Sequence, residues 1–153
     1  MSKKYKISLS IEKRIILHLA NYTRYRKKLI IPNEITQQGI ANAIKIRIEH
    51  VSRSIKKLIQ DDFIYMRSAR IIEANRVKKA YFLTKNGKNY VSEIKRWFRN
   101  KPILIRTKKG EFREIRFSQL NELIDTKIGP LEIYNIYKQS KDNVIDLKKL
   151  NNK

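Results

Sequence analysis

The stretch that decides the fold of this chain reads TQQGIANAI (36–44), KIR (45–47) and IEHVSRSIKKLIQ (48–60). Thr36 has the side chain of a helix N-cap, and the apolar residues at positions 40, 41 and 44 then recur at helical spacing. The three residues 45–47 leave room for a tight turn. A second helix is predicted from Ile48 to about Gln60.

This second helix has two contrasting faces. Val51, Ile55, Leu58 and Ile59 form an apolar stripe at helical spacing. The other face carries polar and charged side chains: Glu49, His50, Arg53, Lys56 and Lys57. A short helix, a turn and a longer basic helix make up the helix-turn-helix plan, whose second helix enters the major groove of DNA.

The net charge of +22 is the strongest global feature of the 153 residues. Residues 1–110 hold 28 Lys or Arg and 7 Asp or Glu, whereas residues 111–153 hold 8 and 7, so the excess lies in the part that contains the helix-turn-helix. A polyanionic partner is the direct inference. The alternative is a Lys-rich thermophile surface, although such surfaces normally balance Lys with Glu.

The segments before the helix-turn-helix are predicted as a helix, a basic run and an extended piece. Ser10 can cap a first helix to about Tyr22, and His18 beside its apolar face is expected to be packed rather than to bind a ligand. Residues 24–28 are basic, and residues 29–32 read as a short extended piece closed by Pro32.

After the helix-turn-helix, residues 63–72 and 80–83 read as two strands, with residues 73–79 as the basic hairpin tip between them. Thr84 can cap a helix from Lys85 to about Arg99, whose apolar face ends with Trp97 and Phe98.

Two parts of the sequence resemble the archaeal winged-helix, MarR-type regulators: residues 36–41 with 50–53 and 56–58, and YFLTKNG (81–87). The resemblance covers about residues 8–100 and implies that the predicted hairpin is a wing, with the following helix at a dimer contact. Trp97 and Phe98 would then pack against a second copy or, equally, cover their own core. The chain departs from the family at the turn, where Lys45 stands in place of the usual Gly.

The last third of the chain is close to neutral and reads as a small appendage. Residues 103–107 and 111–117 form a strong hairpin signal with room for a bulge. Ser118 can cap a helix over residues 119–126, with Glu122 in a near capping pattern, and Gly129-Pro130 breaks it. Residues 131–137 read as a further helix and residues 144–147 as a last strand or turn. The appendage is expected to pack on the winged helix or on a partner chain.

No catalytic constellation stands out, so an enzyme is the weakest hypothesis. The chain lacks Cys, a phosphate-cradling Gly loop and a pair of His at metal spacing, and no cofactor or metal is predicted. No run approaches the roughly 20 apolar residues of a membrane span. The basic N-terminus lacks an apolar signal core, and a cytoplasmic protein is the simplest interpretation.

The sequence therefore predicts an α+β fold: a winged helix-turn-helix over residues 1–100 and a β-hairpin and helix appendage over residues 101–153. The predicted function is sequence-specific binding of double-stranded DNA by a homodimeric transcription regulator. The candidates for base contacts are Arg47, Glu49, His50 and Arg53. The candidates for contacts to the DNA backbone are Thr36, Gln37, Ser52, Lys56, Lys57, Arg76, Lys78 and Lys79. Two alternatives remain open: a module that recruits a protein partner through residues 101–153, and an RNA-binding winged helix.

Overall fold

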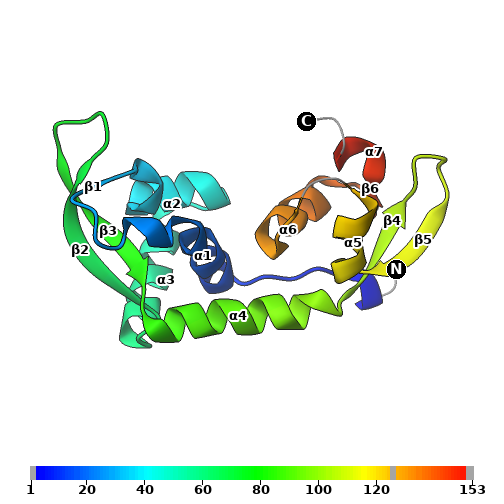
Figure 1. The fold of residues 1–153 in the computed structure, drawn as a ribbon, viewed down its shortest axis with the longest axis horizontal. Coiled ribbons are helices and arrows are strands. Elements are labelled where there is room, and N and C mark those ends of the chain that lie inside the picture. The colour runs from blue at the N-terminus through cyan, green and yellow to red at the C-terminus, as the bar shows by residue number, and fades with distance from the viewer. Residues whose placement is uncertain (1–2, 125–126, 151–153) are drawn as a thin grey trace. The chain divides into compact units, whose positions relative to one another are not determined.

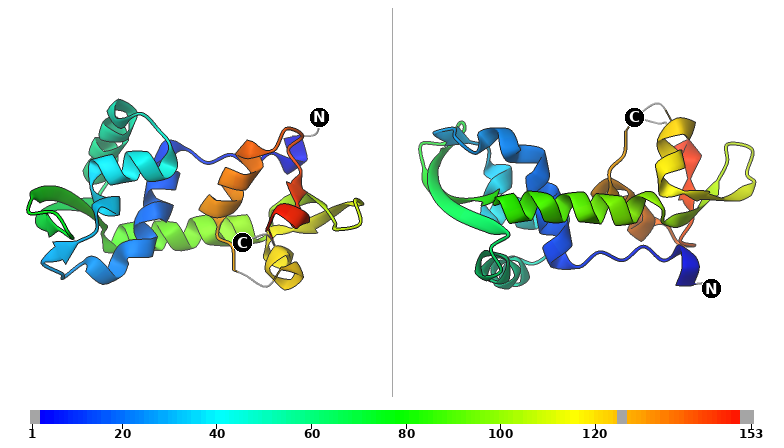
Figure 2. Two further views of the ribbon diagram at one scale, coloured as in Figure 1. Left: turned by 90° about the horizontal axis from the view of Figure 1, so that it is seen from above. Right: turned by 60° about the horizontal axis from the view of Figure 1, so that its bottom comes forward.

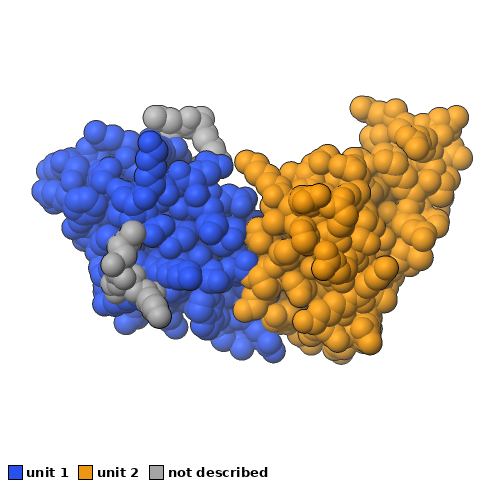
Figure 3. Space-filling model, turned by 180° about the vertical axis from the view of Figure 1, so that it is seen from behind, with its two compact units in different colours: residues 1–9, 93–153 blue, residues 10–92 orange. Residues whose placement is uncertain are grey.

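A computed structural model describes residues 3–124 and 127–150 of the chain. Within this part the fold is α+β, with helices α1 to α7 and two three-stranded sheets (Figure 1). The chain forms two compact units: residues 10–92 are unit 2, and residues 1–9 with 93–153 are unit 1 (Figure 3). This division differs from the predicted boundary at residue 100, because the N-terminal segment and part of a helix belong with the C-terminal third.

Unit 2 begins with α1 (Ile11–Leu19), and the Oγ atom of Ser10 accepts a hydrogen bond from the Lys13 amide as predicted. The α-helix is shorter than expected, because the chain continues from Ala20 as the 3-10 helix η2 (Ala20–Tyr25), which is kinked at Tyr22. The buried face of α1 includes Ile15, Ile16 and Leu19.

The predicted pair of helices is present as α2 (Gln37–Ile44) and α3 (Ile48–Gln60). The Thr36 hydroxyl accepts a hydrogen bond from the Gly39 amide at 3.2 Å, which confirms the N-cap. Lys45 ends α2 with φ 58° and ψ 47°, the left-handed conformation for which Gly is the usual residue. The turn thus keeps the left-handed backbone conformation expected at this position, although the side chain of Lys45 makes that conformation strained.

The apolar stripe of α3 differs from the prediction at its C-terminal end. Val51, Ile55 and Leu58 are buried, but Ile59 is 41% exposed and Ser54 is buried in its place. With 100° per residue, Ser54 lies 60° to one side of Val51, whereas Ile59 lies 80° to the other side. The buried arc of α3 is narrow enough to include Ser54 and exclude Ile59.

The sheet of unit 2 contains β1 (Ile30–Ile31), β2 (Ile64–Ile71) and β3 (Val77–Leu83) in the order β1-β2-β3. Strand β1 pairs parallel with β2, and the 3-10 helix η3 (Asn33–Ile35) leads from β1 to α2. Strands β2 and β3 form a curved antiparallel hairpin (Figure 2).

The tip of this hairpin is shorter than predicted. Residues 77–79 belong to β3, where Lys78 pairs with Ala69 and Lys79 with Ser68, so only residues 72–76 form the turn. The polar and basic composition of residues 73–79 suggested a hairpin tip, but pairing with β2 extends the strand through residues 77–79.

Helix α4 (Lys85–Arg99) has the predicted bounds, and the Thr84 hydroxyl accepts from the Gly87 amide at 3.0 Å. Val91, Ile94 and Phe98 are buried, whereas Trp97 is 56% exposed. The ring of Phe98 meets that of Phe117 edge to face at 5.0 Å, so Phe98 covers the core of its own chain.

Unit 1 contains a second sheet with the order β5-β4-β6, formed by β4 (Pro102–Arg106), β5 (Phe112–Arg116) and β6 (Ile145–Asp146). The β4–β5 hairpin is confirmed, and its register runs from Pro102–Arg116 to Arg106–Phe112 without the bulge for which the sequence left room. The 3-10 helix η1 (Lys3–Tyr5) belongs to the same unit, where Tyr5 donates a hydrogen bond to Glu114 at 2.7 Å.

Three further helices complete unit 1: α5 (Phe117–Leu123), α6 (Pro130–Gln139) and α7 (Leu147–Leu150). The side chain of Phe117 is buried. Ser118 does not cap α5, because the helix already begins at Phe117 and its N-cap residue is Arg116. Instead, the Gln119 Oε1 atom accepts from the Arg116 amide at 2.8 Å, and Glu122 is exposed. The predicted helix end at Thr126 lies outside the described residues.

Candidate nucleic-acid interface

The positive charge is shared by the two units. Residues 10–92 hold 18 Lys or Arg and 6 Asp or Glu, a net charge of +12. Residues 1–9 and 93–153 hold 18 and 8, a net charge of +10. The excess found over residues 1–110 therefore does not belong to the unit of α2 and α3 alone, because the N-terminal residues and the end of α4 contribute to unit 1.

The outward face of α3 brings three of the four base-contact candidates together. Arg53 lies 200° round the helix from buried Val51 and is exposed. An Nη atom of Arg53 lies 3.4 Å from Nδ1 of His50, which is also exposed. Glu49 completes this face and is paired with Arg47, not with Arg53. The guanidinium of Arg53 is therefore at the centre of the exposed face and is not neutralised by the carboxylate one turn away.

Arg47, the fourth candidate, is the N-cap residue of α3. Its side chain is 81% exposed, and its Nε atom lies 3.2 Å from a carboxylate oxygen of Glu49. An ion pair this exposed is worth little, so both side chains can exchange it for contacts with a ligand.

The two lysines of α3 differ in their surroundings. Lys56 is exposed, whereas the Nζ atom of Lys57 lies 3.6 Å from Glu12 of α1. The Ser54 hydroxyl also donates a hydrogen bond to the Glu12 carboxylate, at 3.4 Å, so Glu12 connects α1 to α3. Ser52 is half-buried on the opposite flank of α3. Lys56 is the better placed of the two lysines for a phosphate.

An open groove of about 400 Å³ lies between the N-terminal ends of α2 and α3 and strand β3. The groove brings together residues that are far apart in the sequence, and its lining consists of Thr36, Gln37, Gln38, Ile48, Lys78, Lys79 and Tyr81. Gln37 is half-buried and Lys79 is exposed. The groove thus has neutral side chains of α2 and α3 on one wall and the lysines of β3 on the other.

Two of the predicted backbone contacts are already engaged within the protein. Thr36 is only 2% exposed, and its hydroxyl donates to the Asn33 carbonyl at 2.7 Å while accepting from Gly39. Its hydroxyl therefore serves as a helix cap, which leaves it little available for the phosphate contact predicted from the sequence. Lys78 is half-buried and donates to Oδ1 of Asn33 at 3.3 Å, which leaves it less available than Lys79.

Arg76 and Arg70 extend the cationic surface of the hairpin. Arg76 is exposed in the turn, as predicted. Arg70 was not among the predicted candidates, yet it is exposed and shares a sheet face with Lys79, which lies opposite Ser68. The alternation of side chains along β2 would have placed Arg70 on the same face as Lys79 once the register of the hairpin was known.

His18 takes no part in this surface. It is 5% exposed, and its Nε2 atom lies 2.8 Å from the Glu34 carbonyl oxygen. Burial lowers the pKa of His18, which favours the neutral ring. The expectation of a packed histidine is confirmed.

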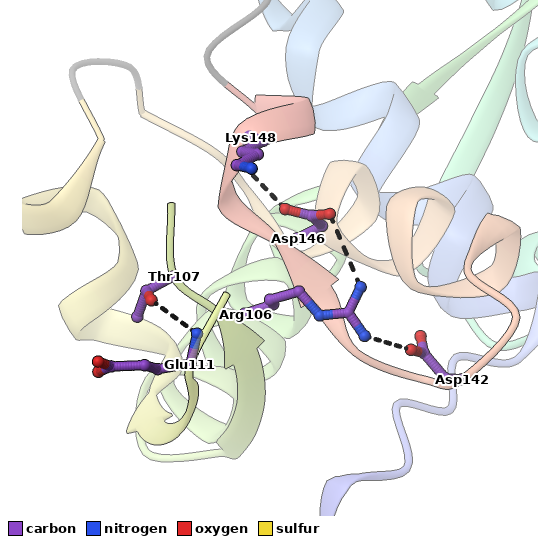
Figure 4. A network of polar contacts seen from close by, with 6 residues as sticks. All are labelled: Arg106, Thr107, Glu111, Asp142, Asp146 and Lys148. Atoms are coloured by element: carbon purple, nitrogen blue, oxygen red, sulfur yellow. Dashed lines mark hydrogen bonds and ion pairs between the residues drawn. The ribbon is translucent and has the colours of Figure 1, made fainter. Parts of the chain in front are cut away.

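Unit 1 has a hollow of its own, of about 690 Å³, between α6, β6 and α7. Arg106 lines it and lies 2.9 Å from Asp142 and 4.0 Å from Asp146 (Figure 4). The Lys148 amide donates to the same Asp146 carboxylate at 3.0 Å. These contacts neutralise Arg106 and fasten the C-terminal strand and helix to β4.

Comparison of the chain with family models, curated proteins and solved structures found no match. No helix in residues 3–124 and 127–150 has the length and apolar character needed to cross a bilayer.

Proposed function

We propose that this chain binds double-stranded DNA as a winged helix-turn-helix regulator, with α3 in the major groove and the β2–β3 hairpin as the wing. The observation that carries the proposal is the position of Arg53. Its guanidinium is exposed at the centre of a helix face directly opposite the buried Val51, and the cationic groove and hairpin belong to the same unit.

The chemistry of the side chains divides their roles. A guanidinium presents a planar pair of donors that matches the O6 and N7 atoms of guanine, so Arg53 is assigned to base recognition together with Arg47, Glu49 and His50. Lys ammonium groups act as point charges, so Lys56 and Lys79 are assigned to phosphates. Arg70 and Arg76, exposed on the hairpin, are assigned to phosphates as well. Contacts with phosphates give affinity without sequence preference.

Titration of the wild-type chain with duplex DNA at several salt concentrations tests the proposal as a whole. Six or more neutralised phosphates should give a log-log slope of about −5 or steeper. A slope near zero at measurable affinity would rule out the nucleic-acid proposal. Competition by double-stranded RNA distinguishes this function from that of an RNA-binding winged helix, since A-form RNA has a major groove that side chains cannot read.

The role of Arg53 is tested on a duplex selected from a random pool and on a scrambled one. Arg53→Ala should weaken binding to the selected duplex by about 1–3 kcal/mol and reduce discrimination between the two. Lys79→Ala is the matched control and should weaken both duplexes similarly. If Arg53→Ala lowers the two affinities equally, Arg53 is a phosphate contact and base recognition passes to Arg47 and His50.

A homodimer is part of the proposal, because two-fold symmetry suits a pseudo-palindromic site with half-sites roughly 10 base pairs apart. Of the two aromatic residues expected at a dimer contact, only Trp97 is exposed, at 56%. Sedimentation at micromolar concentration distinguishes the dimer from the 18.3 kDa monomer.

A further inference from the structure

One arginine of unit 2 faces inward on the protein's own backbone. A single terminal nitrogen of Arg67, on β2, lies 3.2 Å from the Tyr25 carbonyl oxygen, 3.2 Å from that of Arg26 and 2.8 Å from that of Lys28. The guanidinium also stacks on the ring of Phe82, 4.7 Å from its centroid. Arg67 therefore fastens the basic run 24–28 to the sheet.

The position of these carbonyl groups explains why a cation is needed there. They lie at and just after the C-terminal end of η2, where backbone carbonyl groups carry partial negative charge, and of the three the Tyr25 carbonyl also accepts a backbone hydrogen bond, from the Lys28 amide at 3.0 Å. A neutral apolar side chain of similar size, such as that of Met, could pack on Phe82, but it has no N–H group to donate to these carbonyl groups. The contact thus orders a segment that would otherwise lose entropy on binding a ligand.

The ordered segment presents lysines that the fold itself does not use. Arg24 donates to the Asn21 carbonyl and stacks on Tyr25. Lys27 and Lys28, by contrast, are exposed, and neither forms an ion pair with any residue that the structure describes. Adjacent cations that are not paired with a carboxylate repel each other, and a polyanion relieves that repulsion.

The sheet order gives the place of these lysines relative to the candidate interface. The groove borders β3, and β2 and then β1 follow outward from it. Lys28 comes two residues before β1, and the Arg70 amide donates to the intervening Leu29 carbonyl at 3.2 Å. With strands about 4.8 Å apart, Lys27 and Lys28 lie at the outer edge of the same sheet, beyond the hairpin.

We propose that Lys27 and Lys28 bind phosphates of the same duplex beyond the wing, and that Arg67 is the positioning residue that presents them. This inference rests on the proposed function and extends the contact surface by a third segment. The contacts carry no sequence information, because a Lys ammonium reads the charge of a phosphate and not the base.

The test compares two variants of the full chain that lose the same charge. Lys27→Ala with Lys28→Ala should flatten the salt slope by up to about two units, since each lost phosphate contact removes about 0.9. Lys108→Ala with Lys109→Ala is the matched control, because these adjacent exposed lysines lie in the turn of the other unit. A wild-type slope near zero overturns the proposed function and this inference together. A steep wild-type slope with equal changes in both variants overturns this inference alone.

The positioning role of Arg67 is tested by combining variants. Arg67→Met should flatten the slope although Lys27 and Lys28 are intact. Added to the Lys27→Ala, Lys28→Ala variant, Arg67→Met should change the slope no further. A further loss of about one unit in the triple variant would show that Arg67 binds phosphate itself, and would overturn its positioning role.

Discussion

Replacing Lys45 by Gly should make the protein more stable. Lys45 has φ 58° and ψ 47°, and the next amide, that of Ile46, donates to the Ala41 carbonyl at 3.2 Å, so the turn requires this left-handed residue. A side chain in this conformation costs roughly 1–2 kcal/mol. Gly removes the strain but adds about 0.5–1 kcal/mol of backbone entropy to the unfolded chain. The expected net gain is about 0.5–1 kcal/mol in the free energy of unfolding.

Urea unfolding followed by circular dichroism measures this gain, with Lys45→Ala as the control. Lys45 is exposed, so both variants remove the same surface charge, but Ala keeps a Cβ and therefore the strain. The Gly variant should unfold at higher urea than the Ala variant, with an unchanged dependence on urea concentration. Equal midpoints for the two variants would refute the reasoning from backbone strain.

Three further substitutions test the stability of the two units. Gly39→Ala should lower the unfolding free energy by about 1–3 kcal/mol or more, because a Cβ at Gly39 would overlap the Asn33 carbonyl; Gly129→Ala, where the nearest atom is 3.5 Å away, should have little effect. His18 has a pKa lowered by burial, so the folded chain binds its proton less tightly than the unfolded chain, and stability should fall as pH drops below about 6.5. His18→Gln should remove that loss when unfolding is measured between about pH 7.5 and pH 5.5; an unchanged pH profile would assign the loss to other groups.

The helices of unit 2 were predictable from local signals. The hydroxyls of Thr36 and Thr84 each accept from the amide three residues later, and the sequence shows both caps directly. Arg53 was also predictable, because its angle from Val51 follows from helix geometry alone. These features depend on interactions within one or two turns of the chain.

The parts that sequence reasoning missed depend on long-range contacts. Lys79 joins a strand because β2 pairs with it, and Thr36 is withdrawn from the surface by packing that no local pattern shows. The three carbonyl groups that Arg67 reaches lie 39 to 42 positions earlier in the chain. Helical periodicity likewise could not separate Ile59 from Ser54, since the width of the buried arc depends on the neighbours of α3.

The composition of unit 1 from two separate segments has a consequence for the order of folding. Unit 2 is one uninterrupted run, residues 10–92, so all of its contacts become possible while the ribosome is still adding α4. Unit 1 joins residues 1–9 to residues 93–153, and bringing them together closes a loop as long as the whole of unit 2. Its strand β6 pairs parallel with β4 across about 40 residues. Pairings so distant form late. Residues 3–5 therefore wait for β4 and β5, which follow unit 2 in the chain, and a folded unit 2 shortens that search by holding residues 10 and 92 in one body.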